Sequence, residues 1–358
     1  MNKENVLEEL KSIIYPKFKR DIVSFGFVKN VEVEGENISI YLEIPSNNSE
    51  VKETLESSIK SKFENFKLNL NIKTPEIQEA KKRNIAPNIK HFVMVSSGKG
   101  GVGKSSTSVN LALALSQAGK SVGLLDADIY GPNIPRMLSL NNQRPVVDEK
   151  LMKLIPLRAY GIKVISMGMM YEEGQSLIWR GPMIMRAIEQ MLTDVVWGEL
   201  DILVIDMPPG TGDAQLTLAQ SVPVSAGISV TTPQVVALDD SIRSIDMFNK
   251  LNIPLAGIIE NMSGFVCPNC SSVHNIFGKD GGENIAKENN CPILAKIPIE
   301  PLLREGGDSG KPIVYFNPNL LSSKEYVKAA NKLIAFLDEV GDRVDNSSIQ
   351  PIKDAKNK

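Results

Sequence analysis

The sequence has few of the features that mark secreted, membrane-spanning or nucleic-acid-binding proteins. Its 358 residues include only three cysteines and two histidines, and the net charge at pH 7 is −2 with a pI near 5.9. Balanced charge of this kind provides no basic surface for nucleic acid or anionic membrane. No apolar run approaches the length of a bilayer span, and the first residues, MNKENVLEELKSII, are charged rather than an apolar leader. We therefore expect a cytoplasmic protein with reduced thiols and with neither nucleic-acid nor membrane partners.

The residues that are present favour a two-domain α/β protein. Apolar residues make up 42% of the chain, which is enough for a sizeable core. Residues 1–73 mix helical and alternating patterns and predict a small α+β domain, and the polar, proline-containing residues 74–90 predict a linker. In residues 91–340 apolar strands alternate with helices, which predicts a doubly wound, mostly parallel sheet. Residues 341–358 predict a disordered tail.

The most informative motif is GKGGVGKS at residues 98–105. Its spacing fits the phosphate-binding loop G-x-x-x-x-G-K-[ST], in which backbone N–H groups surround phosphate oxygens. Lys104 would reach the β/γ-phosphates and Ser105 would bind Mg²⁺. The apolar run HFVMVSS before the loop and the Leu- and Ala-rich stretch after it predict the strand and helix that such a loop requires. The predicted nucleotide-binding residues of the loop are Gly98, Lys99, Gly100, Gly101, Val102, Gly103, Lys104 and Ser105.

The same residues contain an alternative motif, because Gly98, Gly100 and Gly103 match the dinucleotide fingerprint G-x-G-x-x-G. A dinucleotide-binding turn has no use for an ammonium group and a magnesium ligand at this place. Lys104 and Ser105 therefore favour a P-loop.

Acidic residues follow two of the predicted strands. Asp126 and Asp128 end SVGLLDAD, and DILVIDMPPGTGD contains Asp206 and Asp213. An apolar strand followed by aspartate is the Walker B arrangement, in which the carboxylate supports Mg²⁺ directly or through water. The alternative is that such residues cap the next helix or turn. We favour the magnesium role for Asp206, whereas Asp128 fits either water positioning or turn formation.

Cys267 and Cys270 form the motif CPNC, which can present two sulfurs to one metal. A [4Fe–4S] cluster or a tetrahedral zinc usually takes four ligands, and a two-fold dimer would supply a second identical pair. The spacing alone leaves a cluster, a zinc site that includes His274, and a redox dithiol open. Cys291 is expected to be a small buried hydrophobe, and His91 a packing or exposed residue.

One motif resembles a group of ATPases, and four others resemble one family within that group. KGGVGKS, with its second lysine, resembles the deviant Walker A motif of the MinD/ParA-type dimeric ATPases. DADIYGPNIPRML, DILVIDMPPGTGDAQLTLAQ, ENMSGFVCPNC and REGGDSGKPI, in this order, resemble the Mrp/ApbC family of iron–sulfur cluster carriers over residues 91–340.

The resemblance implies roles for individual residues. Lys99 matches the lysine that crosses a nucleotide-sandwich dimer to the partner's phosphates, as an arginine finger does. Asp128 matches the acid that orients the attacking water, and residues 210–213 match the switch II turn. The remaining matched positions are Asp126 and Asp206 for Mg²⁺, Asn261 and Pro298 for the adenine base, and Cys267 and Cys270 for the cluster.

The implied function is a homodimeric, slowly hydrolysing ATPase that carries a labile [4Fe–4S] cluster between its subunits. Its partners would be scaffold proteins and apo iron–sulfur proteins, and its cofactors ATP and Mg²⁺. The alternatives are a ParA/MinD-like positioning ATPase and an insertase for zinc or nickel. The mixed charge of the tail and of the closing helix argues against membrane or DNA positioning.

Residues 1–73 resemble the small iron–sulfur assembly domain that often precedes this ATPase, but two positions depart from its pattern. No cysteine occurs in EIPSNNSEV after the second predicted strand. Where the family has Asp-Pro followed by an acidic residue, this chain has Tyr15-Pro16-Lys17. These departures exclude a direct thiol role and favour target docking or a structural role.

Overall fold

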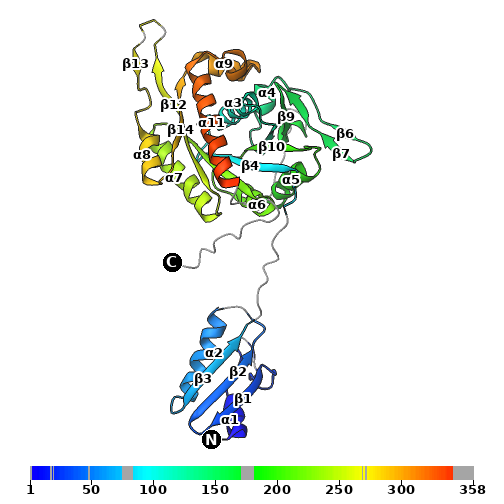
Figure 1. Ribbon diagram of the computed structural model, residues 1–358, viewed down its shortest axis with the longest axis vertical. Helices are drawn as coiled ribbons and strands as arrows, with labels where there is room; N and C mark the ends of the chain where they lie inside the picture. The colour runs from blue at the N-terminus through cyan, green and yellow to red at the C-terminus, as the bar shows by residue number, and fades with distance from the viewer. Residues whose placement is uncertain are drawn as a thin grey trace. The chain divides into compact units, whose positions relative to one another are not determined.

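Two compact units make up the chain, Met1–Ala80 and Lys81–Lys358 (Figure 1). The computed structural model describes residues 2–16, 18, 20–46, 49–74, 84–170, 181–267, 269–270 and 272–341. None of the helices in these ranges combines the length and apolarity that a bilayer crossing requires.

The N-terminal unit is a three-stranded sheet with helices, as the sequence predicts. Its elements are α1 (Lys3–Leu10), β1 (Val28–Glu34), β2 (Asn37–Glu43), α2 (Ser49–Lys62) and β3 (Lys67–Lys73). β1 and β2 pair antiparallel, and α2 connects β2 to the parallel strand β3. Every second residue of β2 is buried, which gives Ile38, Ile40 and Leu42 to a core that Leu55 and Ile59 of α2 complete.

The larger unit is built on a nine-stranded sheet in the order β13-β12-β11-β4-β10-β5-β9-β8, with β14 also pairing with β12. Its strands are β4 (Ile89–Ser96), β5 (Val122–Asp126), β8 (Leu157–Ala159), β9 (Ile162–Ser166), β10 (Leu200–Asp206), β11 (Val224–Thr231), β12 (Leu255–Val266), β13 (Val273–His274) and β14 (Ile293–Ile299). A separate hairpin joins β6 (Val146–Asp148) to β7 (Lys153–Ile155). β8 pairs antiparallel with β9, and β13 pairs antiparallel with β12. The other strands of the main sheet pair parallel, which confirms the predicted doubly wound, mostly parallel sheet.

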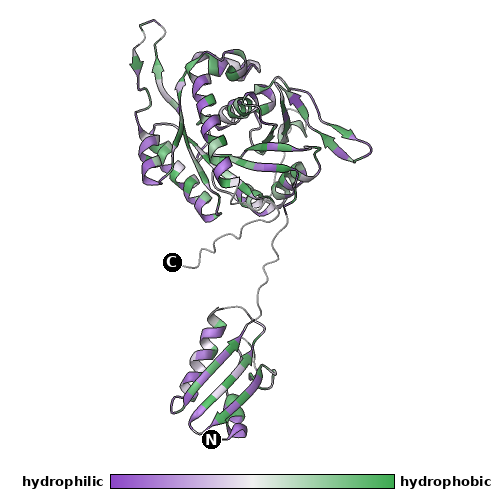
Figure 2. Cartoon of the chain, viewed as in Figure 1, coloured by the Kyte–Doolittle hydropathy of each residue, from purple (hydrophilic) through white to green (hydrophobic). Residues whose placement is uncertain are grey.

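Helices cover both faces of this sheet. They are α3 (Lys104–Gln117), α4 (Ile134–Met137), the 3-10 helix η1 (Met167–Met169), α5 (Gly181–Thr193), α6 (Asp213–Ser221), α7 (Val235–Lys250), α8 (Gly281–Glu288), α9 (Pro301–Ser309), α10 (Ile313–Phe316) and α11 (Leu321–Gly341). In β4, Val93 and Val95 pack in one core with α3 and α11, whereas Phe92 and Met94 pack in the other with α5 and α6. Both faces of the strand are therefore buried, which explains its continuous apolar run. Figure 2 shows the resulting apolar colour along the central strands.

Residues before the predicted end of the linker at residue 90 already pack in the larger unit. β4 begins at Ile89, and Asn84 and Ala86 are buried against this unit, with the Asn84 side chain accepting a hydrogen bond from the Ala86 N–H (2.9 Å). The Ile85 N–H donates to the carbonyl of Ser221 at the end of α6. Most of the predicted linker (residues 75–83) and the predicted tail after Gly341 lie outside the described residues.

Candidate functional site

The loop at residues 98–105 runs from the carboxyl end of β4 to the amino end of α3. Gly101 and Gly103 have φ angles of +82° and +86°, a conformation that only glycine adopts without strain. A Cβ atom on Gly103 would lie 2.1 Å from Nδ2 of Asn261, and one on Gly98 would lie 2.0 Å from the carbonyl oxygen of Asp240. No side chain caps the first turn of α3, so its N–H groups are available to phosphate oxygens.

Lys104 lies among carboxylates at the start of α3. Its side chain is only 6% exposed, and its Nζ atom is 2.8 Å from Oδ2 of Asp206 and 3.6 Å from Oδ2 of Asp128. Asp206 ends β10 and Asp128 follows β5, so the parallel sheet brings both acids to the loop at one edge. The sequence-predicted residues Lys104, Asp128 and Asp206 therefore meet at one place.

Asp206 also accepts two hydroxyl hydrogen bonds. The Ser105 Oγ donates to its Oδ2 at 2.6 Å, and the Ser108 Oγ donates to its Oδ1 at 2.7 Å. Ser108 was not among the predicted site residues, although its position four residues after Lys104 on the same helix face could have indicated it. These contacts hold the Asp206 carboxylate in one orientation.

Asp126 lies beside this cluster and is fully buried. It accepts hydrogen bonds from Ser166 Oγ (2.8 Å), from the Asp128 N–H (3.2 Å) and from the Ile134 N–H (3.4 Å). Burial and then the Asp206 carboxylate raise the pKa of Asp126 to about 8, against the opposing effect of Lys104. Ser166 was missed from the sequence because its role depends on the pairing of β5 with β9, in which Asp126 lies opposite Ser166.

The oxygen atoms of this cluster fit a magnesium ion. Mg²⁺ prefers hard oxygen ligands from one or two carboxylates together with phosphate and water. The Ser105 hydroxyl and the Asp206 carboxylate, 2.6 Å apart, offer such a set beside the loop. A dinucleotide site has no need for this arrangement, so the geometry agrees with a P-loop rather than with the alternative fingerprint.

Two residues predicted to contact the base lie in different surroundings. The Asn261 side chain is buried and donates to the Val102 carbonyl of the loop at 2.9 Å. Pro298 lies on β14 and lines an open surface cavity of about 370 Å³ with Ser263 and Lys296, and no loop residue lines this cavity. Asn261 is thus joined to the loop, and the role of Pro298 stays a prediction.

Lys99 lies within the loop, and the turn at residues 210–213, which is predicted to be switch II, lies beside it. The Ser97 hydroxyl donates to the Lys99 carbonyl at 2.9 Å, and within the described residues the Lys99 ammonium makes no ion pair. The Gly210 N–H donates to the Ser97 carbonyl, and the Gln215 amide donates to the carbonyls of Gly210 and Pro208. Asp213 begins α6. The turn is therefore attached directly to the end of β4.

The thiol pair lies on a hairpin that extends from the sheet between β12 and β13 (Figure 1). Cys270 is exposed and Cys267 is half-buried, and the Cys267 N–H donates to the Ser272 carbonyl across the hairpin. Hydrogen bonding with Ser272 and with the Cys267 side chain lowers the pKa of the Cys270 thiol. No three His, Cys, Asp or Glu side chains gather into a metal site within the described ranges, so one hairpin offers two thiols.

The other candidate residues are less central. His274 lies on β13 with its ring 6.5 Å from that of Phe265. Cys291 is half-buried near Ile285 and Ala286, and burial raises the pKa of its thiol.

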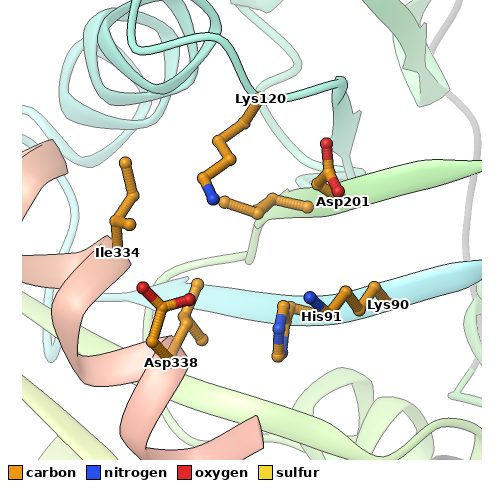
Figure 3. Close-up of a pocket in the computed structure, with 8 residues that line it drawn as sticks. Lys90, His91, Lys120, Asp201, Ile334 and Asp338 are labelled. Atoms are coloured by element: carbon orange, nitrogen blue, oxygen red, sulfur yellow. The ribbon is translucent and has the colours of Figure 1, made fainter.

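His91 belongs to a separate small cavity at the amino ends of β4 and β10, away from the P-loop edge (Figure 3). Its Nδ1 lies 3.3 Å from Ser225 Oγ. Burial and then Lys90 lower the pKa of His91; Lys120 acts in the same direction, and Asp338 and Asp201 oppose it. The imidazole is therefore held neutral in the fold.

This environment predicts that His91 contributes a loss of stability in mild acid. The unfolded chain binds a proton at His91 near pH 6.5 and the folded chain only at lower pH, so the contribution of His91 to the free energy of unfolding should fall as the pH drops below about 6.5. The raised pKa of Asp126 acts in the opposite direction in parent and variant alike, so the slope is compared between them. Urea unfolding at pH 7.5 and 5.5 measures it by tryptophan fluorescence, since both tryptophans lie after residue 170, in the larger unit. Relative to the parent, the His91→Gln variant should lose less free energy of unfolding between pH 7.5 and 5.5, whereas His274→Gln should follow the parent. Equal slopes in the parent and His91→Gln would contradict the assignment.

The sheet order, the glycine-rich loop with its uncapped helix and the Lys104–Asp206–Ser105 contacts define a P-loop NTPase of the α/β class. Residues 88–334 match the family described as NUBPL iron-transfer P-loop NTPase, and residues 3–68 match the iron–sulfur cluster assembly protein family. The chain belongs to this family of NUBPL-type iron-transfer P-loop NTPases.

Relatives match along most of the chain. It is 55% identical to the "Iron-sulfur cluster carrier protein" of Helicobacter pylori over 359 residues, which cover 98% of each chain. It is 45% identical to the "Iron-sulfur cluster transfer protein NUBPL" of Mus musculus over 248 residues, or 69% of this chain and 77% of that one.

Solved structures agree with the fold. A nucleotide-binding protein from Archaeoglobus fulgidus in complex with ADP is 36% identical, covers 63% of this chain and 88% of its own, and has a TM-score of 0.56. The cell division ATPase MinD of Pyrococcus furiosus is 21% identical, covers 69% of this chain and 99% of its own, and has a TM-score of 0.52.

Proposed function

We propose that this protein is a homodimeric ATPase that carries a labile [4Fe–4S] cluster and transfers it to apo iron–sulfur proteins. The observation that carries the proposal is that one unit holds both a complete P-loop and a thiol pair that is at least partly exposed. Relatives that match nearly the whole chain bear the name of cluster carriers, which supports the same function.

The number of thiols supports a dimer. A [4Fe–4S] cluster is held by four thiolates, and each chain offers Cys267 and Cys270 on its hairpin. A two-fold axis places an identical pair opposite the first, which completes the four. The lowered pKa of the Cys270 thiol favours the thiolate that binds iron.

The surface around the P-loop supports a dimer as well. Large apolar side chains are exposed after the carboxyl ends of β5 and β11, namely Tyr130 (73% exposed), Val235 (71%) and Val236 (66%). Lys99 lies on the loop at the same edge, and no described residue forms an ion pair with it. A second copy that faces this edge would cover the apolar side chains and would receive the Lys99 ammonium at its phosphates.

ATP chemistry would use the residues gathered at the loop. The loop N–H groups and Lys104 would bind the phosphates, and Asp128 would orient the attacking water. Ser105 and Asp206, with Asp126 behind them, would hold Mg²⁺, which neutralises charge on the β- and γ-phosphate oxygens when bound. Lys99 of the second copy would stabilise charge on the transferring phosphoryl group. Asn261, already joined to the loop, would contact the base.

The N-terminal unit would act through docking. All three cysteines lie beyond residue 260, so this unit has no thiol to offer a cluster. We assign it the recognition of scaffold or recipient proteins, in a reducing cytoplasm.

Anaerobic reconstitution tests the proposed function. Protein purified without air and treated with iron and sulfide should bind about two of each per chain, with the absorbance and Mössbauer spectrum of a [4Fe–4S] cluster. It should then activate an apo iron–sulfur enzyme. Stoichiometric zinc in place of iron and sulfide would instead support the metal-insertase alternative.

A further inference from the structure

β12 is continuous from the sheet to the thiol hairpin. This twelve-residue strand pairs with β11 and β14 in the sheet and then with β13 in the hairpin, and Cys267 follows its last residue. Asn261, halfway along it, donates to the Val102 carbonyl of the P-loop. One strand therefore contacts the nucleotide loop and carries the thiols.

The strand bends between these two regions. Met262 has a φ angle of +58° and Gly264 one of +84°, and the register against β14 shifts between Asn261 and Phe265. A non-glycine residue at positive φ is costly unless its surroundings hold it in place. Something next to the bend must therefore stabilise it.

Glu260 makes the contacts that hold the bend. Its side chain is fully buried; Oε1 accepts a hydrogen bond from Ser263 Oγ at 2.5 Å, and Oε2 accepts one from the Gly282 N–H at 2.6 Å. Ser263 lies between the two residues of positive φ, and Gly282 lies in the first turn of α8. The carboxylate thus ties the bend to a helix of the globular unit.

The approach to α8 is close and specific. A Cβ atom on Gly282 would lie 2.8 Å from Oε2 of Glu260, so glycine is what permits this contact. The positive end of the helix dipole also favours a carboxylate there. Because Glu260 and Asn261 are consecutive in an extended strand, their side chains lie on opposite faces of it. A shift of Asn261 at the P-loop would therefore move Glu260 against α8.

We propose that Glu260 is a positioning residue that couples the nucleotide site to the thiol hairpin. It fixes the direction in which the hairpin leaves the sheet, and nucleotide binding at the loop changes that direction through Asn261 and Glu260. The inference rests on the proposed function for its biological meaning, but its test requires only nucleotide and thiols.

The experiment measures alkylation of Cys267 and Cys270 in a Cys291→Ala background, with and without a magnesium complex of a non-hydrolysable ATP analogue. In the full-length parent the rate of alkylation with the nucleotide analogue and the rate without it should differ about fivefold or more. The ratio of these two rates is the measure of coupling. In Glu260→Ala, which loses both hydrogen bonds, the ratio should fall to one, while nucleotide affinity stays within about threefold of the parent. Glu260→Gln should keep the ratio, because its amide oxygen can accept from Gly282 and its amide nitrogen can donate to Ser263.

A milder variant keeps the test decisive if Glu260→Ala does not fold. Ser263→Ala removes only the contact on the hairpin side, and Ser263 is only partly buried. Its ratio should lie between the parent value and one. An unchanged ratio in Ser263→Ala and Glu260→Ala, loss of the ratio in Glu260→Gln, or a parent ratio of one would each overturn the proposal.

The result is distinguishable from a failure of the proposed function, because alkylation is measured on the thiols without any cluster. Protein that binds iron and sulfide but shows no nucleotide-dependent alkylation would overturn the coupling alone. Protein that shows the coupling but binds no cluster would overturn the carrier function alone.

Discussion

Replacing Cys267 and Cys270 together by alanine is expected to reduce the iron and sulfide bound after anaerobic reconstitution to background. These side chains are the two sulfur ligands that the hairpin offers, and a [4Fe–4S] cluster that loses its thiolates has no ligands of comparable affinity there. Both residues are at least partly exposed, so the free energy of unfolding should change by no more than about 0.5 kcal/mol. Iron and sulfide analysis with the absorbance spectrum measures the first effect, and urea unfolding measures the second.

Cys291→Ala is the matched control for this change. It also removes one thiol, but from a half-buried position beside Ile285 and Ala286, away from the hairpin. It should bind as much cluster as the parent. If the double variant retained parental iron and sulfide, the hairpin would not be the cluster site.

Replacing Lys99 by alanine is expected to lower the single-turnover rate of ATP hydrolysis by roughly 10³-fold, the effect of a phosphate-directed cation supplied by a second subunit. Within the described residues the ammonium has no acidic partner of its own chain, so its charge is available to a second copy. ATP-dependent dimerisation should weaken as well, whereas binding of ADP to the single chain is retained, because backbone N–H groups of the loop and Lys104 supply it. Rapid-quench hydrolysis and sedimentation velocity measure the two effects.

Lys324→Ala is the control, since Lys324 is an exposed lysine near the start of α11. It should hydrolyse ATP and dimerise as the parent does. Lys99→Arg should keep part of the rate, because it retains the cation with a different shape. Parental hydrolysis and dimerisation in Lys99→Ala would exclude a role in trans.

Much of the fold and site could be predicted from local patterns. The strand, loop and helix of the P-loop occupy consecutive residues, and the spacing of Lys104 and Ser105 has one chemical meaning. Asp128 and Asp206 could be placed together because parallel strands end at the same edge of a sheet, and the structure finds both at Lys104. The CPNC spacing likewise predicted two neighbouring thiols.

Contacts between distant segments required the structure. Ser166 meets Asp126 only because β9 lies beside β5 in one register, and Asn261 reaches Val102 across 159 residues of sequence. The start of the larger unit before residue 90 has the same cause, since Ile89 pairs with Leu200 of β10.

The sequence by itself therefore determined the class of the protein, its phosphate loop and its thiol pair, because each depends on residue types at short, fixed spacing. The tertiary structure decided which groups orient them. Three hydrogen bonds follow from strand order, register and helix packing: those of Ser108 to Asp206, of Ser166 to Asp126 and of the Gly282 N–H to Glu260. Such contacts form between atoms that the chain brings together only when the whole sheet is assembled, and no local pattern encodes them.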